Sequence, residues 1–160
     1  MADILVPTVA QGLMWALMAL GVYITFRVLD IADLSVEGSF PLGAAVAATA
    51  LASGYGVTAA FLLAAIAGAL AGIVTGILTT KLKIPPLLAG ILTMIGLYSV
   101  NLHVMGKANV ALLRVDTVFS YAAGMGLTSD MAMMAVGLVG VMLVGVILYW
   151  FFGTELGTAI

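Results

Sequence analysis

The sequence predicts an all-α integral membrane protein of about five transmembrane helices, with a broken or re-entrant segment between the first two. Two observations support this fold class. The chain is 64% hydrophobic and only 8% charged, whereas soluble domains carry about a quarter charged residues. The few charges are also clustered, and they leave uncharged runs of 23, 43, 23 and 24 residues. Because a membrane-spanning helix needs about 20 apolar residues, the longest run is long enough for two helices.

The five spans are expected near residues 5–26, 39–53, 57–79, 86–104 and 131–152. The long uncharged run between Glu37 and Lys81 is divided by the segment "SGYG", residues 53–56, which favours a turn. The span before this turn is the shortest of the five. The N-terminus carries Asp3 and no basic residue before the first apolar run, which is not the pattern of a cleaved signal peptide.

The first span contains the segment "QGLMWALMALGVYITF", residues 11–26, which is helical in character because Leu, Met and Ala dominate it. Met14, Met18 and Tyr23 are candidates for facing a transport path. The more common role of methionine at helical spacing is to fill space in packed contacts. Both interpretations stay open from the sequence.

The third span contains three glycines at four-residue spacing, Gly68, Gly72 and Gly76. Residues four apart lie on one face of a helix, and small residues on one face let two helix backbones approach closely. Ordinary helix packing is the simpler interpretation of this face. A contact that moves during a transport cycle is the alternative.

The fourth span opens with Pro85 and Pro86, which are tolerated in a first helical turn because the missing amide donors would be unpaired there. Near its other end lie Asn101 and His103, and a single histidine at that position is more often an interfacial residue than a ligand. The fifth span ends in the aromatic pair Tyr149 and Trp150, which suits the level of the lipid headgroups.

Basic residues suggest how the spans are oriented. Lysine and arginine concentrate in cytoplasmic loops, which places the "KLK" segment, residues 81–83, inside and the N-terminus outside. Lys107 and Arg114 then fall in an outer loop, against that rule. The segment at 109–127, "NVALLRVDTVFSYAAGMGL", fits either a short extracellular helix or a partly buried outer loop.

The sequence lacks the motifs of several functional classes. It contains no cysteine, so thiol catalysis and cysteine-bound metal are excluded. It has no phosphate-binding loop of the G-x-x-x-x-G-K-[ST] type, no H-E-x-x-H and no serine elbow. A basic patch that would bind nucleic acid is also missing. We therefore expect neither an enzyme, nor a cofactor or metal, nor a nucleic-acid partner.

One short stretch, "RVLDIADLSVEGSF" at residues 27–40, holds four of the twelve charges. An exposed cytoplasmic loop would explain the charges but not the apolar residues that alternate with them. A proton or ion relay could use Asp30, Asp33 and Glu37, because carboxylates within membranes often mark such paths. In a third interpretation the stretch is a broken helix, in which Asp33 or Ser35 caps the next helix. Non-helical backbone at membrane depth must be buried in protein or line a cavity.

The same region carries a family resemblance. The segment at 16–48, "ALMALGVYITFRVLDIADLSVEGSFPLGAAVAA", resembles the N-terminal part of ABC-importer permeases of the branched-chain amino acid and ribose type. The closest subgroup has a loop reading "DLSVEGSF" or "DLTVDGSF", and its members are usually assigned to the uptake of amino acids, including aromatic ones, or related small solutes. The segment "IPPLLAGILTMIGLYSVNLHVMG", residues 84–106, resembles that subgroup as well.

The resemblance implies a multi-pass permease in the bacterial cytoplasmic (inner) membrane, within the lipid bilayer. It implies an ABC ATPase on the cytoplasmic side, an extracytoplasmic solute-binding protein and a second permease subunit, expected as a homodimer. ATP hydrolysis would take place in the separate ATPase. The residues expected to form the helix break beside the translocation path are Asp30, Asp33, Ser35, Glu37, Gly38 and Ser39.

The last residues, "FFGTELGTAI" at 151–160, resemble the approach to a cytoplasmic coupling loop in such permeases, through Gly153, Glu155 and Gly157. The coupling loop itself does not follow. The resemblance therefore implies that residues 1–160 are a single transmembrane permease domain, truncated before the coupling loop. Two other functions stay open: an ATP-independent helical channel or ion-coupled carrier using Asp30 and Glu37, and an inactive truncated remnant.

Overall fold

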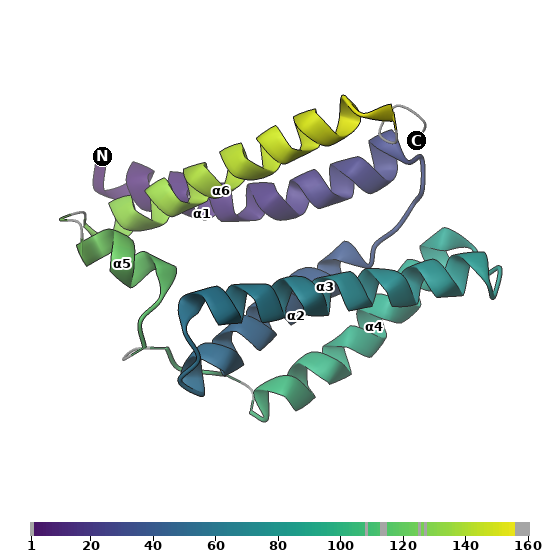
Figure 1. Ribbon diagram of the computed structural model, residues 1–160, viewed down its shortest axis with the longest axis horizontal. Coiled ribbons are helices and arrows are strands. Elements are labelled where there is room, and N and C mark those ends of the chain that lie inside the picture. The colour runs from purple at the N-terminus through teal and green to yellow at the C-terminus, as the bar shows by residue number, and fades with distance from the viewer. Residues whose placement is uncertain (1, 108, 113–114, 125, 127, 156–160) are drawn as a thin grey trace. The chain divides into compact units, whose positions relative to one another are not determined.

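The computed structural model describes residues 2–107, 109–112, 115–124, 126 and 128–155, and in this part the regular structure is helical throughout. The predicted all-helical class is therefore confirmed (Figure 1). The elements are α1 (Ala2–Tyr23), its π-helical continuation η1 (Ile24–Val28), α2 (Val36–Ala52), α3 (Val57–Thr80), α4 (Pro86–Met105), α5 (Val118–Gly124) and α6 (Ser129–Phe152).

The observed helices match the five predicted spans to within a few residues. In the described part of the chain, four are long and apolar enough to cross a membrane: Ile4–Val28, α3, α4 and α6. The fifth, α2, is apolar but has only 17 residues. Its length of about 25 Å at 1.5 Å per residue falls short of the roughly 30 Å of a bilayer's hydrocarbon core.

The chain folds as two compact units, residues Met1–Ile24 with Thr117–Ile160, and Thr25–Asp116. In the first unit, α1 packs against α6, and α5 also packs against α6. A Cβ at Gly137 would lie 2.9 Å from Cβ of Leu13, and one at Gly140 would lie 3.7 Å from Leu17. The later residue of α6 meets the later residue of α1, so the two helices run in the same direction.

This parallel arrangement decides how α2 is counted. Two helices that cross a membrane in the same direction need an odd number of crossings between them along the chain. The helices α3 and α4 alone would supply two, which would make α1 and α6 antiparallel. We therefore count α2 as a crossing despite its length, in agreement with about five transmembrane helices.

In the second unit, α2 packs against both α3 and α4, and α3 also packs against α4. Gly38 lies against Met94, and the hydroxyl of Thr49 donates to the carbonyl oxygen of Val104 at 3.4 Å, so α2 and α4 are parallel. Between α3 and α4, the buried hydroxyl of Thr75 donates to that of Thr93 at 3.0 Å. Hydrogen bonds of this kind join transmembrane helices that have no hydrophobic driving force between them.

Local sequence signals set several helix ends. The predicted turn between α2 and α3 is confirmed, and Gly54 adopts a φ of 87° there. Pro86 is the first residue of α4, as predicted, while Pro85 precedes the helix as its N-cap. Gly106 ends α4 with a φ of 63°, a left-handed conformation that glycine adopts without a steric penalty. The ambiguous outer segment contains α5, a short helix of 7 residues.

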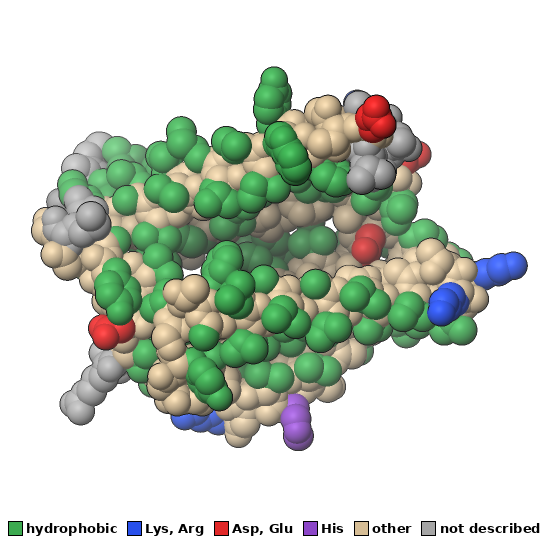
Figure 2. Space-filling model, viewed as in Figure 1, with side chains coloured by type: hydrophobic (Ala, Val, Ile, Leu, Met, Phe, Trp, Pro, Cys, Tyr) green, Lys and Arg blue, Asp and Glu red, His purple; other side chains and the backbone are tan. Residues whose placement is uncertain are grey.

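The interior is built from small side chains, and the large ones point outward. Buried apolar residues of the described part are alanines except for Leu42. Figure 2 shows hydrophobic side chains spread over the outer surfaces of the helices. On α3, for example, Phe61, Ile66 and Leu70 are each more than half exposed. This distribution suits a lipid environment, because lipid tails solvate large apolar side chains while small residues let helices approach closely.

The α1–α6 contact predicts a position-specific effect of adding one methyl group. The Gly137→Ala change places a Cβ 2.9 Å from Cβ of Leu13, which cannot rotate away, whereas Gly145→Ala on the same helix meets nothing within 4 Å. Both changes gain the same helix propensity. We expect Gly137→Ala to be less stable than Gly145→Ala by about 1–3 kcal/mol, measured by thermal unfolding of the purified full-length permease in detergent. Equal stabilities would contradict the described contact.

Candidate functional site

The charged stretch forms a real interruption between two helices. The helix α1 continues as η1, a π-helix, to Val28, and residues 29–35 are non-helical before α2 begins at Val36. Asp30 adopts a φ of 51°, which is uncommon for a residue other than glycine. Short π-helices within longer helices often occur at functional sites. The broken-helix geometry predicted from the sequence is therefore confirmed.

This interruption is partly enclosed by protein. Ser35 is only 7% exposed, and Asp33 and Leu34 are half-buried, whereas Asp30 and Ile31 are exposed. The amide of Ile31 donates to the carbonyl oxygen of Thr25 at 2.8 Å, which turns the chain back on the end of η1. The segment is thus not a freely solvated loop. Its enclosed half meets the requirement that irregular backbone at membrane depth be covered by protein.

The carboxylate of Asp33 organises the start of α2. Its Oδ1 accepts a hydrogen bond from the amide of Ser35 at 2.8 Å, and its Oδ2 accepts one from the hydroxyl of Ser35 at 3.0 Å. Asp33 thereby binds the turn that leads into the helix. Ser35 occupies the N-cap position, but its side chain makes no capping hydrogen bond. Asp33 accepts only from Ser35, which precedes the first helical residue Val36. Neither of the two caps predicted from the sequence, Asp33 or Ser35, is therefore seen to accept from a free amide of α2.

The next residues of the stretch continue this arrangement into α2. The amides of Gly38 and Ser39 both donate to the carbonyl oxygen of Ser35, at 3.0 and 2.9 Å, and form the first helical turn. Glu37 lies in that turn and is exposed, where a negative charge is favoured by the positive end of the helix dipole. Whether Asp30, Asp33 and Glu37 act as a relay stays a prediction.

The interruption rests directly on α4 at Gly90. A Cβ at this position would lie 2.5 Å from Oδ1 of Asp33 and 2.7 Å from the amide nitrogen of Leu34. One turn further along α4, a Cβ on Gly38 of α2 would lie 2.9 Å from the Cα of Met94. Only glycine fits at these two close approaches. The broken segment and the first turn of α2 are thus held against one face of α4.

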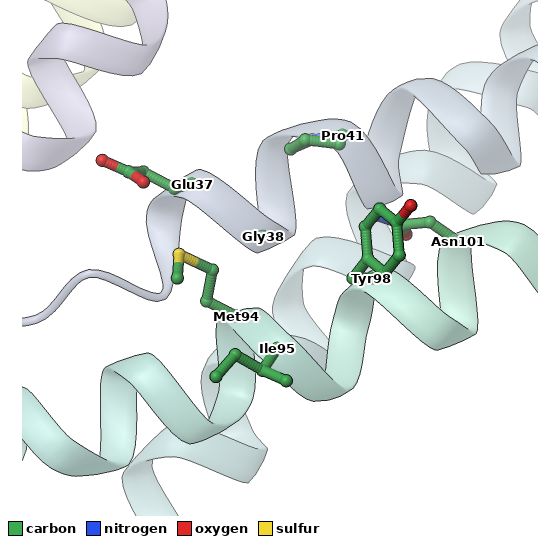
Figure 3. A pocket seen from close by; sticks show the side chains of 7 residues that line it. All are labelled: Glu37, Gly38, Pro41, Met94, Ile95, Tyr98 and Asn101. Carbon is green, nitrogen blue, oxygen red and sulfur yellow. The ribbon is translucent and has the colours of Figure 1, made fainter.

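A pocket of about 350 Å³ lies beside this contact, between α2 and α4 (Figure 3). Its lining residues come from both helices: Glu37, Gly38, Pro41, Met94, Ile95, Tyr98 and Asn101. Pro41 lies inside α2 and has no amide hydrogen, so the carbonyl of Glu37 lacks its usual partner four residues on. The pocket thus combines apolar walls with a small number of polar groups, as ligand sites generally do.

Asn101 is the functional candidate that sequence reasoning did not single out. Its side chain is 7% exposed, and in the described part of the chain its Oδ1 accepts no hydrogen bond. A buried polar atom without a partner is rare in native proteins. The signal in the sequence was a carboxamide within an apolar span. Only the structure shows that this carboxamide faces α2 and not lipid.

Other predicted residues are not among those that line this pocket. Met14 and Met18 on α1 are half-buried, and the methyl of Met14 would be 3.2 Å from a Cβ at Gly137, which places Met14 at the α1–α6 contact. Tyr23 is 58% exposed near the end of α1. Whether these residues face a transport path stays a prediction.

The three glycines that share one face of α3 do not contact another helix among the described residues. A Cβ at Gly68, Gly72 or Gly76 meets no described atom within 4 Å. The buried residues of α3 are Ala60, Ala71 and Thr75. The three glycines thus do not form the contacts of α3 with α2 and α4. A role of these glycines in helix packing stays a prediction.

The predicted approach to the coupling loop is only partly described. Gly153 is the C-cap of α6, and its amide donates to the carbonyl oxygens of Tyr149 and Trp150 at 3.1 Å. Glu155 is exposed. Gly157 lies outside the described residues. The helix therefore ends where the sequence predicted, and the role of this end in coupling stays a prediction.

These features define a class of protein: a multi-pass helical membrane protein with an interrupted helix and a pocket beside the interruption. Comparison with known proteins identifies the family. Residues 4–160 match the family described as the permease component of branched-chain amino acid transport systems. The chain belongs to this family of membrane transport permeases, which agrees with the expectation of a bacterial inner-membrane protein that is not itself an enzyme.

Two curated relatives are similar over most of this chain. A tyrosine transport system permease protein of Clostridioides difficile (strain R20291) is 40% identical over 116 residues, which are 72% of this chain and 39% of the relative. An uncharacterized protein of Rickettsia prowazekii (strain Madrid E) is 37% identical over 118 residues, 74% of this chain and 41% of the relative. The chain thus matches about two fifths of the length of each. No solved structure matches it.

The contact at Gly90 gives a testable consequence for the broken segment. In Gly90→Ala, the new methyl group would overlap the Asp33 carboxylate and the Leu34 backbone, whereas Gly96→Ala on the same helix meets nothing within 4 Å. We expect Gly90→Ala to lower the free energy of unfolding by about 1–3 kcal/mol relative to Gly96→Ala. Thermal unfolding of the two full-length variants measures this difference, and a Gly90→Ala protein as stable as its control would show that the segment does not rest on α4.

Proposed function

We propose that this chain is part of the membrane permease of an ATP-driven ABC importer that takes up an amino acid. The family match over residues 4–160 is the observation that carries the proposal. The name of the Clostridioides difficile relative supports an amino acid as solute, and within that class an aromatic one. Residues 1–160 would form one transmembrane permease domain, leading through Gly153, Glu155 and Gly157 to a coupling loop in the complete permease.

The proposed partners follow from this function. An ABC ATPase would bind on the cytoplasmic side and supply the energy of ATP, and a solute-binding protein would deliver the amino acid from the other side. A second permease subunit, identical to this one, would complete the path. ATP binding would shift the permease between outward-open and inward-open states, to the extent that the ATPase binds one state more tightly than the other.

Within this proposal, the interruption at residues 29–35 lies beside the translocation path. Two observations support this position. The contacts that hold the segment include those of the Asp33 carboxylate with Ser35 and a close approach to Gly90 of α4. It also leads directly into Glu37 and Gly38, which line the pocket between α2 and α4. A few residues that join two rigid helices are a common place for a hinge.

The experiment compares Asp33→Ala with Asp130→Ala in the full-length permease, assembled with its ATPase and binding protein in proteoliposomes. Asp33 holds Ser35 through two hydrogen bonds, whereas Asp130 is exposed in the first turn of α6. A hydrogen bond to a charged group contributes about 1.5–3 kcal/mol, so we expect ATP-dependent amino acid uptake to fall about tenfold or more in Asp33→Ala. Uptake should be unchanged in Asp130→Ala.

The same assay separates the proposed function from its alternatives. An importer takes up the amino acid only when ATP and the ATPase are present inside. Uptake that instead follows a proton or sodium gradient without the ATPase would establish an ion-coupled carrier and overturn the proposal. Equal uptake and equal protein level in Asp33→Ala and the wild type would show that the interruption does not shape the path.

A further inference from the structure

The pocket between α2 and α4 has a different chemical group at each end. Glu37 in the first turn of α2 supplies a carboxylate, and Asn101 on α4 supplies a carboxamide. Between them the walls are apolar, formed chiefly by Pro41, Met94 and Ile95. Figure 3 shows Glu37 at one end of this set of residues and Asn101 at the other. The carboxylate of Glu37 points away from the other labelled side chains. Its volume of about 350 Å³ lies within the range of small-molecule sites.

The Asn101 carboxamide is better explained by a ligand than by packing. It is 7% exposed and its Oδ1 has no hydrogen-bond donor in the described part of the chain. A buried acceptor without a donor destabilises the fold, and a leucine at this position would not. Thr75 and Thr93, the buried polar pair of the same unit, satisfy each other at 3.0 Å. Asn101 is the exception to that pattern.

Asn101 lies in the middle of the contact line between α2 and α4, called the seam below. A second cavity of about 270 Å³ continues the seam and shares Pro41 and Asn101 with the first pocket. It is lined further on by Ala44, Ala48 and Met105. Asn101 thus lies where the two cavities meet. A solute that passes along the seam must go by this carboxamide.

Tyr98 lines the same pocket beside Asn101. It precedes Asn101 by three residues and therefore lies on the same face of α4. Figure 3 shows its ring in front of the Asn101 carboxamide, and its side chain is 67% exposed. A tyrosine ring and the thioether of Met94 also provide favourable contacts for an aromatic group in the pocket.

We propose that the seam pocket is a contact site for the transported solute and that Asn101 is a specificity-determining residue in it. In this inference, Oδ1 of Asn101 accepts a hydrogen bond from a donor on the side chain of an aromatic amino acid. The inference rests on the proposed function, because it assigns a site to the amino acid that the importer carries.

The test compares tyrosine, which has a side-chain hydroxyl, with phenylalanine, which lacks it. Full-length wild type and Asn101→Leu are each assembled with the same ATPase and binding protein in proteoliposomes, and kcat/KM for uptake of both amino acids is measured. Selection by the binding protein cancels when the tyrosine-to-phenylalanine ratio of one permease is divided by that of the other. A site that hydrogen-bonds a substrate hydroxyl discriminates strongly against the analogue without it, so we expect the ratio to fall about tenfold or more in Asn101→Leu.

Two controls make the result specific. Ser99→Leu introduces the same side chain on α4 at an exposed position that does not line the pocket, and it should leave the ratio unchanged. Asn101→Asp keeps two acceptor oxygens and should retain the preference for tyrosine. A ratio that is the same in wild type and Asn101→Leu overturns the inference. So does a wild type that transports amino acids but neither of these two.

A second pair of variants covers the case in which Asn101→Leu does not assemble. Ile95 lines the pocket and is 60% exposed, so Ile95→Trp can fill the pocket without a clash in the interior. Leu92 is 47% exposed on the same helix and does not line it. We expect about a tenfold loss of uptake in Ile95→Trp and no loss in Leu92→Trp. Equal uptake in both would show that the solute does not use the pocket and would overturn the inference.

These outcomes distinguish the two proposals. If the wild-type assembly takes up no amino acid in the presence of ATP, the proposed function fails and this inference fails with it. If the wild type is active but neither Asn101→Leu nor Ile95→Trp differs from its control, the inference alone fails and the importer remains.

Discussion

The arrangement of the second unit depends on how the chain satisfies its backbone where the helix is interrupted. Residues 29–35 lie outside the helices, so the regular helical pattern does not pair all of their backbone groups, and lipid offers no hydrogen bonds. The Asp33 carboxylate supplies acceptors for the amide and hydroxyl of Ser35, and Gly90 lets this turn lie directly on α4. Once the turn is fixed, α2 must start beside α4 and run parallel to it. The pocket at Glu37 and Asn101 is a consequence of that start.

Small residues make the other contacts possible. Gly38 against Met94 and Gly137 against Leu13 bring helix backbones close, and dispersion contacts then act over short distances along the whole seam. Large side chains such as Phe61 and Ile66 contribute nothing to these seams and face outward. In water such a surface would drive aggregation. In a bilayer it is solvated, so stability comes from the closeness of the seams and not from a core of large side chains.

The sequence predicted the features that depend on neighbouring residues, namely the helix spans and the interruption. It did not predict the contacts between residues that are distant in the chain. Charge spacing located the spans, because the bilayer fixes helix length, and the polar residues around Asp33 located the interruption. The equal spacing of Gly68, Gly72 and Gly76 correctly places them on one face, but it does not tell which face meets α2 and α4, and the buried face holds Ala71 and Thr75 instead. The contact of Gly90 with Asp33, and the enclosure of Asn101, join segments far apart in the chain and left no periodic signal.

The interruption is joined to the pocket through the first turn of α2 and one turn of α4. Asp33 and Ser35 fix the start of α2, and Glu37 and Gly38 in its first turn form one wall of the pocket. Gly90, which carries the interruption, lies one helical turn before Met94, which forms the opposite wall. Both walls lie about one helical turn, or 5.4 Å, from the broken segment. A shift of this segment on α4 would therefore move both of them. Because packed seams switch between discrete arrangements and do not deform continuously, this short path is a physical route from a hinge to a change in the shape of the pocket.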